Sequence, residues 1–309
     1  MPLIQPPMLT HGGTHPARAM RMMIRDLARG SQGVTEANDL KVRQLSTPGS
    51  AVRVGDGSSI IRGASWGQGA YTQYNVGDAI IPIAPTGSTG RSDLVLHRIV
   101  DPEYEGNLDP RSDDIGFFHI IPNVGPTATT VPAGMTAIPL ARIDIPPNTA
   151  TITDAMIRDL RRIANPRRER RLHTAFPGSK QSLTYSDNRW RVWPTAARWT
   201  IPVPDWAVNV QAITTLAGLR MDSADVYATM QQHFGPIQGQ DTVIDDDQGN
   251  NVRRSTVVLA DSLGVTAAMR GTSQALYVQT LMWKSETGNL AVDGGTSLIC
   301  DVEFNEGVI

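Results

Sequence analysis

The feature that most constrains the fold is a regular alternation of apolar and polar residues near the end of the chain. Residues 298–304 read Leu-Ile-Cys-Asp-Val-Glu-Phe, and every second position is apolar. Successive side chains of a strand point to opposite faces of a sheet, so the run predicts a strand with one buried face. Residues 276–283 repeat the pattern. We therefore expect the chain to be mainly β.

Composition and turn residues support this fold class. Twenty-eight glycines and 21 prolines supply turns, and a hydrophobic content of 40% is sufficient for a packed core. We predict a small N-terminal β-barrel or sandwich, a short linking helix and a C-terminal jelly-roll β-sandwich. The expected boundaries are 1–33 for an N-terminal helical arm, 34–148 for a β-rich domain, 149–175 for a trimerising helix with a basic linker, and 176–309 for the jelly roll.

Short runs of strand-forming residues, separated by turn residues, occupy both halves. In the first half the expected strands are 52–54, 59–62, 71–74, 79–83, 93–99, 117–121 and 137–143. In the second half they are 183–193, 199–203, 208–216, 226–230, 254–259, 276–283 and 298–304.

The first expected helix begins near Pro16, with Thr14 or His15 as the cap, and ends at Gly30. An apolar stripe carries Met20, Ile24 and Leu27. A basic face recurs at helical spacing and consists of Arg18, Arg21, Arg25 and Arg29. Two interpretations stay open: this face is solvated, or it docks onto an acidic neighbouring subunit. Aromatic residues are absent from the segment, which argues against nucleic acid.

A second helix is expected over residues 152–164, where Thr151 and Asp154 resemble a capping box and Pro166 ends the segment. Its apolar stripe holds Ile152, Met156, Leu160 and Ile163. About 13 residues are too few for stability alone in water, so the stripe must pack on something. Two copies of itself, in a homotrimer, or its own β-domain would serve. An exposed basic linker follows at residues 167–171.

Motifs for catalysis are missing. The sequence has no phosphate-binding loop, no nucleophile elbow and no zinc-protease helix, and its six histidines are dispersed. We expect no enzyme, no cofactor and no metal site. Residues 245–250 offer several oxygen ligands but depart from the calcium-binding loop pattern, so a solvated hairpin loop is favoured. Cys300, the single cysteine, is expected to be a core residue of a protein that folds in a reducing cytoplasm.

Charge and hydropathy exclude two partner classes. A net charge of −2 provides no general attraction for nucleic acid, and no apolar run approaches the ~20 residues of a membrane helix. Five of the six tryptophans lie in the second half. Trp190 and Trp193 point to opposite faces of one expected strand, and an indole ring can stack on a sugar. They are the glycan-binding candidates, with a core or subunit interface as the alternative.

Several ordered motifs resemble minor tail proteins of phages that infect actinobacteria. The first is Ala-Arg-Gly-Ser-Gln-Gly-Val at 28–34, followed by Asp-Leu-Lys-Val at 39–42. Further matching runs lie at 71–76, 90–95, 101–106, 137–150 and 152–161. The resemblance covers about residues 10–172. It implies a baseplate or fibre N-terminal domain, in which a small β-domain at residues 34–148 and the basic helix attach to the tail and a following helix lies at a threefold axis.

The resemblance implies a structural virion protein of the tail tip or baseplate, made in the host cytoplasm and trimeric. Its partners would be other tail proteins and, through residues 176–309, a host cell-surface glycan. A purely architectural connector that holds another tail subunit is the second hypothesis. A cell-wall or capsule hydrolase is the third.

Overall fold

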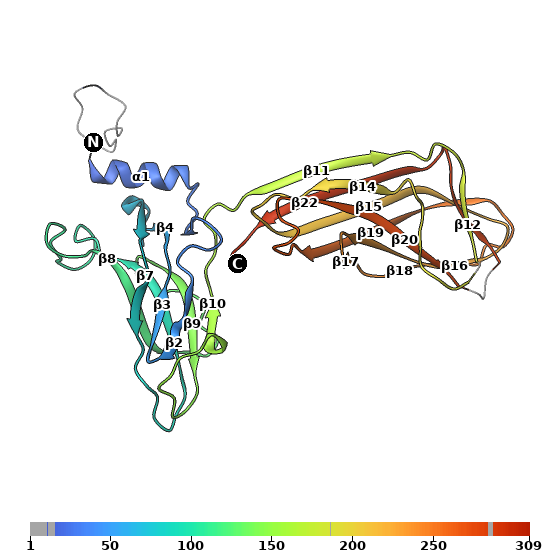
Figure 1. The fold of residues 1–309 in the computed structure, drawn as a ribbon. Helices are drawn as coiled ribbons and strands as arrows, with labels where there is room; N and C mark the ends of the chain where they lie inside the picture. The colour runs from blue at the N-terminus through green and yellow to red at the C-terminus, as the bar shows by residue number, and fades with distance from the viewer. Residues whose placement is uncertain (1–10, 12–15, 186, 284–286) are drawn as a thin grey trace. The chain divides into compact units, whose positions relative to one another are not determined.

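The computed structural model describes residues 11, 16–185, 187–283 and 287–309, and the chain divides into two units (Figure 1). Unit 1 comprises Met1–Pro166 with Val308–Ile309, and unit 2 comprises Arg167–Gly307. Both are built from antiparallel strands, which confirms the mainly β class.

The described residues of unit 1 form three separate antiparallel sheets and not one closed barrel. The first sheet has the order β1 (Gly33–Val34), β4 (Gly57–Arg62) and β5 (Ala70–Asn75). The second has the order β2 (Val42–Gly49), β3 (Ala51–Val54) and β6 (Ala79–Pro82). The third has the order β10 (Ile157–Asp159), β9 (Ala137–Ile145), β7 (Arg91–Ile99) and β8 (Gly116–Val124). One core joins them, and its fully buried side chains include Leu40, Ile61, Leu140 and Ile143.

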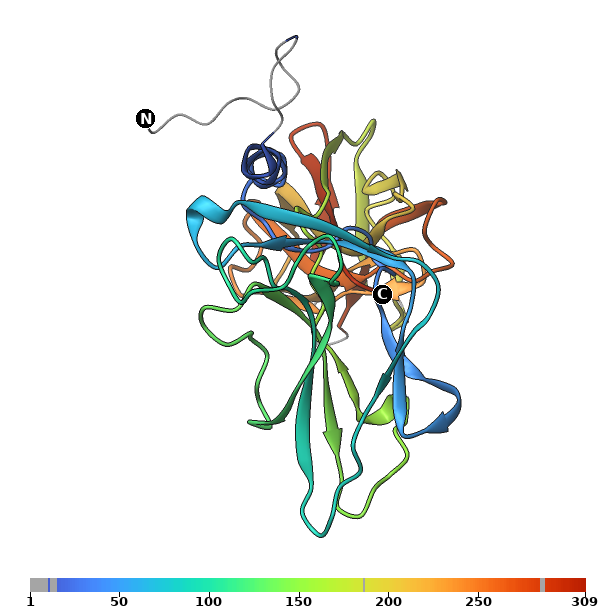
Figure 2. The ribbon, with the colours of Figure 1, turned by 90° about the vertical axis from the view of Figure 1, so that its left-hand side faces the viewer.

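The helix α1 (Ala17–Leu27) lies across one end of the strands of unit 1 and contacts β5 and the short 3-10 helix η1 (Trp66–Gln68). Figure 2 looks almost along its axis. The predicted capping residues Thr14 and His15 lie outside the described residues. At the other end the amide of Gly30 donates to the carbonyl of Arg25 at 2.8 Å, while Arg29 adopts a left-handed φ of 54°. Gly30 therefore closes the helix as expected, although the first left-handed residue is Arg29.

The helix predicted over residues 152–164 is wrong. A single 3-10 turn, η2 (Asp154–Met156), leads into β10, which pairs with β9. The backbone is satisfied by distant strands, since the amide of Ile152 donates to Gly49 O at 2.9 Å and that of Leu160 to Leu140 O at 3.0 Å. Asp154 forms reciprocal hydrogen bonds with Gln44 instead of a capping box. A segment too short for a stable helix has joined a sheet.

The four side chains predicted at a trimer interface pack within their own unit. Ile152 is 1% exposed and Ile163 is 8% exposed, and both belong to the main core of unit 1. Met156 packs half-buried against that core, and Leu160 packs against a smaller cluster around Leu94 and Leu96. Their assignment to a threefold axis is therefore corrected. The stripe packs on its own domain.

In its described residues, unit 2 is a β-sandwich of two six-stranded sheets. One sheet has the order β11 (Arg168–Ala175), β22 (Ser297–Glu306), β15 (Ala207–Asp222), β21 (Asn289–Val292) and β12 (Gln181–Thr184), with β19 (Arg253–Gly264) also paired to β15. The other has the order β13 (Arg191–Val192), β20 (Ser273–Met282), β16 (Val226–Phe234) and β17 (Ile237–Gln238). β14 (Arg198–Pro202) also pairs with β20, and β18 (Thr242–Asp246) pairs with β16.

The alternation at residues 298–304 has the predicted result. Leu298, Cys300, Val302 and Phe304 are fully buried between the sheets. Burial raises the pKa of the Cys300 thiol to about 12, so this residue is an inert part of the core. The expected basic linker is wrong, because residues 168–175 form β11 and pair with β22 along their whole length. Arg170 forms an ion pair with Asp301 across that pair of strands.

Candidate functional site

The basic face of α1 contacts unit 1 itself. Arg21 is 9% exposed, and its guanidinium forms ion pairs with Asp101, at 3.2 Å, and Glu103. Its Nε donates to Gln68 O at 2.9 Å, and the group lies 5.4 Å from the ring centroid of Tyr104. The acidic partner that the sequence suggested is therefore the chain's own 101–105 loop. Docking onto another tail protein is not open to Arg21, and that assignment is corrected.

Two of the other arginines of this face, Arg18 and Arg25, also contact unit 1. Arg18 donates to Gly67 O at 2.9 Å, and the guanidinium of Arg25 lies 5.2 Å from the ring centroid of Trp66. Arg29 is exposed at the end of the helix. The apolar stripe consequently lies on another face of α1, where Leu27 is 72% exposed. A helical wheel identifies the basic face and the apolar face of α1. It does not determine which face contacts the domain, because that depends on charged residues far away in the sequence.

The tryptophans of unit 2 do not form an exposed aromatic surface. Trp193 is 5% exposed and Trp199 is 8% exposed, and both belong to the core. Trp190, Trp206 and Trp283 are half-buried. Trp193 is therefore not a sugar-stacking residue, whereas Trp190 keeps an accessible part. The concentration of tryptophan in this half reflects the volume of its core, which is the alternative that the sequence left open.

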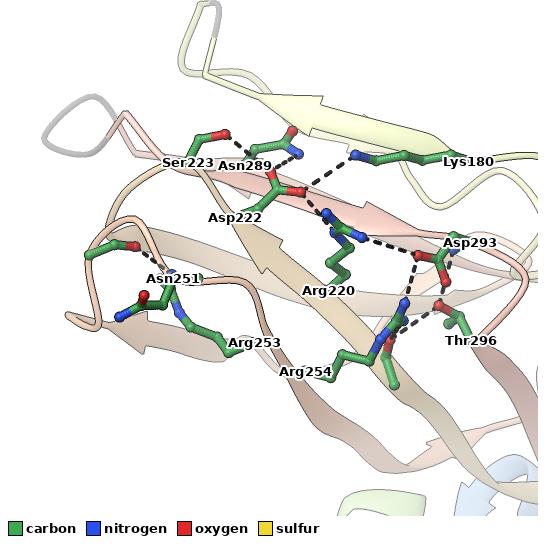
Figure 3. A network of polar contacts seen from close by, with 12 residues as sticks. Lys180, Arg220, Asp222, Ser223, Asn251, Arg253, Arg254, Asn289, Asp293 and Thr296 are labelled. Atoms are coloured by element: carbon green, nitrogen blue, oxygen red, sulfur yellow. Dashed lines mark hydrogen bonds and ion pairs between the residues drawn. The ribbon is translucent and has the colours of Figure 1, made fainter.

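A chain of alternating charges crosses the surface of unit 2 around the β-bulge of β15 (Figure 3). Lys180 Nζ lies 3.4 Å from Asp222 Oδ2, and Arg220 Nε lies 2.9 Å from the same oxygen. Arg220 also reaches Asp293, at 4.0 Å, and Arg254 contacts Asp293 at 2.7 Å. Each carboxylate in this network thus has two cationic neighbours.

These contacts keep the carboxylates ionised. A hydrogen bond from Asn289, at 2.8 Å, and others from Arg220 and Ser223 lower the pKa of Asp222 to about 2. Arg254 likewise lowers the pKa of Asp293. A general acid or base requires a pKa near the working pH, and these groups are far from it. The network therefore acts as a brace between strands and does not resemble a catalytic centre.

An open groove lies between β18 and β19 and holds about 790 Å³. Residues 242–248 form one wall, residues 253–258 form the other, and Met221 contributes to the lining. The two strands belong to different sheets and are not paired with each other. The segment 245–250, expected as a hairpin loop, therefore carries the end of β18 and part of a connection between sheets.

Arg253 holds the closed end of this groove. Its Nε contacts both carboxylate oxygens of Asp246 at 2.8 Å, and its NH1 donates to Gly249 O at 2.6 Å and to Asn251 O at 2.7 Å. This side chain thus fixes the connection between the strands. The bond from Arg253 also lowers the pKa of Asp246, so the ion pair persists well below neutral pH.

The groove was not predicted from the sequence, because β18 was not predicted as a strand. The apolar run Val243–Ile244 is short, and the acidic residues after it directed attention to a loop. A three-residue apolar and β-branched run, Thr242–Ile244, was the available signal. No local sequence pattern indicates that these two strands join different sheets and leave their facing edges without a shared ladder.

Within the described ranges, no group of three or more His, Cys, Asp or Glu side chains is placed to hold a metal ion. No helix in the same ranges has the length and apolar character needed to cross a bilayer.

Comparisons with known proteins identify no family. No family model matches the sequence, and no curated protein matches it. Among solved structures, that of the infectious bursal disease virus Gx strain is 10% identical over 90% of this chain and 80% of that chain, with a TM-score of 0.26. The VP2 subviral particle of the same virus is 11% identical over 91% and 77%, with a TM-score of 0.25. Dimeric latent PorU from Porphyromonas gingivalis is 11% identical over 94% and 26%, with a TM-score of 0.26. Likeness this low carries no argument about function.

Proposed function

We propose that this chain is a structural, non-enzymatic virion protein of a phage tail tip or baseplate, and that it acts as a connector holding another tail protein. The observation that carries the proposal is the groove of unit 2, where, among the described residues, the facing edges of β18 and β19 have no ladder partner. Unpaired edges favour the addition of another polypeptide, and natural proteins usually cover them. The tail motifs in residues 10–172 supply the viral context.

The location can be tested directly. Antibodies against the purified chain should label the tail tips of intact particles, and its peptides should appear in mass spectra of gradient-purified virions. Antibodies adsorbed with the purified chain serve as the control. Absence of the chain from purified particles would contradict the proposal.

Attachment to a host-cell glycan is the second candidate function. It rests on Trp190, which is half-buried in the segment between β12 and β13 and stands beside Arg189, whose side chain is 81% exposed. An indole face flanked by a guanidinium can stack on a sugar ring and donate to its hydroxyl groups. Full-length protein and its Trp190→Ala variant should then differ in binding to host cells, with Trp66→Ala in unit 1 as the control. Equal binding by all three proteins would remove this candidate.

We also propose that the protein has no hydrolase activity. The Asp222 and Asp293 carboxylates of unit 2 are bound in ion pairs, which leaves them unsuited to proton transfer. Incubation with host cell walls should release no reducing sugar or peptide. Turnover that a single Asp or Glu substitution abolishes would show the opposite.

A homotrimer remains part of the proposal, with a different contact surface. The apolar stripe of α1 consists of Met20 and Ile24, which are half-buried, and Leu27, which is exposed, and it is the contact surface that we propose between copies in place of the segment 152–164. Met20, Ile24 and Leu27 follow the four-three spacing of a coiled-coil seam, and copies of one helix can pack through it around a closed axis.

A further inference from the structure

We propose that the groove between β18 and β19 binds an extended segment of another protein, which adds as a strand and carries apolar and basic residues in alternation. The proposal deepens the connector role and rests on it for the source of the partner. It depends on three properties of the groove, namely its free edges, its pinned ends and its charge.

The edges are the first property. Among the described residues, β18 pairs only with β16, and β19 pairs only with β15. The other edge of each strand therefore presents backbone N–H and C=O groups without a ladder partner. An extended peptide satisfies such groups with its own backbone, as in other cases of strand addition. A guest in this groove could form a ladder with β18, with β19 or with both.

The two walls of the groove are joined by side-chain contacts at both of its ends. At one end Arg253 contacts Asp246, as described above. At the other end the amide of Gln240 donates to Asp261 Oδ1 at 2.8 Å, and Gln232 Nε2 donates to Asp261 Oδ2 at 2.7 Å. Four to five residues of β18 lie between these contacts, roughly 15 Å of strand at ~3.3 Å per residue. A guest of similar length would need little rearrangement of the groove, which favours binding.

The walls determine which side chains fit. Ile244 and Val257 point inward, at 9% and 7% exposure, and Met221 lies beside them. Val243 is 55% exposed and Val258 is 50% exposed at the outer rim. Because side chains alternate along a strand, every second residue of the guest would cover the apolar interior. These positions should be apolar.

The rim of the groove is negatively charged, because its two arginines are already paired with carboxylates of the same chain. Arg253 is neutralised by Asp246, and Arg254 is neutralised by Asp293. Asp245 and Asp247 are exposed, and within the described part of the chain neither has an ion pair. The outward positions of the guest should therefore be Lys or Arg, which would lie next to these carboxylates.

The test uses the full-length protein and a fluorescent peptide of the sequence Lys-Val-Lys-Val-Lys-Val, blocked at both ends. Fluorescence anisotropy should show saturable binding. Methylation of alternate backbone nitrogens keeps the side chains but removes donors, and it should weaken binding by about tenfold or more. A Glu-Val repeat of equal length should bind more weakly than the Lys-Val peptide.

Two protein variants complete the design. Asp245→Lys should weaken binding of the Lys-Val peptide by about fivefold or more, because it reverses a charge at the rim. Asp205→Lys, an exposed site outside the groove lining, is the matched control and should bind as the unmodified protein does. Hydrogen exchange should show that the bound peptide protects amides within 242–245 and 254–258.

Three results would overturn the inference: no saturable binding, binding unchanged by N-methylation, or equal weakening by both Asp variants. Each result would mean that the peptide does not add as a strand in this groove. The peptide would then have no site on the protein or would be held by general charge attraction. The virion labelling experiment is independent. A chain found at the tail tip that does not bind the peptide would leave the proposed location in place and remove this inference alone.

Discussion

The hydroxyl of Thr214 lies 2.7 Å from the side-chain oxygen of Gln232 and donates to it across the interior of unit 2. Thr214 is on β15 in one sheet and Gln232 is on β16 in the other, and both are fully buried. The amide nitrogen of Gln232 donates to Ala212 O at 2.9 Å and to Asp261. This single side chain therefore links the two sheets and one end of the groove.

Replacing Gln232 with Leu should lower the free energy of unfolding of unit 2 by about 1–3 kcal/mol, because buried polar partners lose their hydrogen bonds. Urea titration followed by tryptophan fluorescence measures this, since five of the six tryptophans belong to unit 2. The double variant Thr214→Val with Gln232→Leu should lose less than the sum of the single losses. Strict additivity would mean that the two side chains do not interact.

Unit 1 should become less stable in mild acid because of His97. This residue is 2% exposed, and burial lowers its pKa from 6.5 to about 4. Between these values the unfolded chain binds more protons than the folded chain, so stability rises with pH and is lost as pH falls from about 6.5 to about 4. This difference in pKa between the unfolded and the folded state corresponds to a loss in the free energy of unfolding on the order of 3 kcal/mol.

The variant His97→Asn should flatten this dependence while it keeps a polar group near Ser59, whose hydroxyl lies 2.9 Å from His97 Nδ1. Burial also lowers the pKa of His119, so a smaller slope of the same sign should remain. The measurement is a set of urea titrations of the full chain at several pH values. Proteolytic cleavage within unit 1 reports its unfolding at each urea concentration. An unchanged slope in the variant would refute the assignment to His97.

Arg29→Gly should stabilise α1. Arg29 holds a φ of 54° at the end of the helix, where glycine has no steric cost. The expected gain is about 0.5–1 kcal/mol in the free energy of unfolding. Arg29→Ala removes the same side chain but keeps the backbone penalty, so it should give no gain. An equal effect of both variants in thermal unfolding would attribute the change to the lost charge.

Leu27→Glu should dissociate the proposed trimer, because it places a charge in the seam between copies of α1. Light scattering should give roughly 100 kDa for the unmodified protein, as expected for a closed trimer, and 33.5 kDa for the variant. Leu172→Glu in β11 of unit 2 is the control, since Leu172 is also exposed, at 66%. A monomeric unmodified protein at micromolar concentration would exclude the trimer.

Many of the strands predicted from local apolar and β-branched runs are confirmed. The runs near 52–54, 71–74, 93–99, 137–143 and 298–304 all lie within observed strands, because a period of two requires no knowledge of the partner strand. β11 and β18 were missed. Their residues alternate weakly or carry charge, and pairing with β22 and β16 determines that they are extended.

The β class, most strands, the position of α1 and the burial of Cys300 can be derived from the amino-acid sequence, because each follows from composition, period or turn residues close in the chain. Long-range packing sets the remaining features: α1 contacts its unit through Arg21, Ile152 and Ile163 enter a core, Trp193 is buried, and β18 and β19 leave an open groove. These outcomes depend on residues far apart in sequence. An apolar stripe or an aromatic cluster indicates that its side chains will be buried. The rest of the chain determines what they pack against.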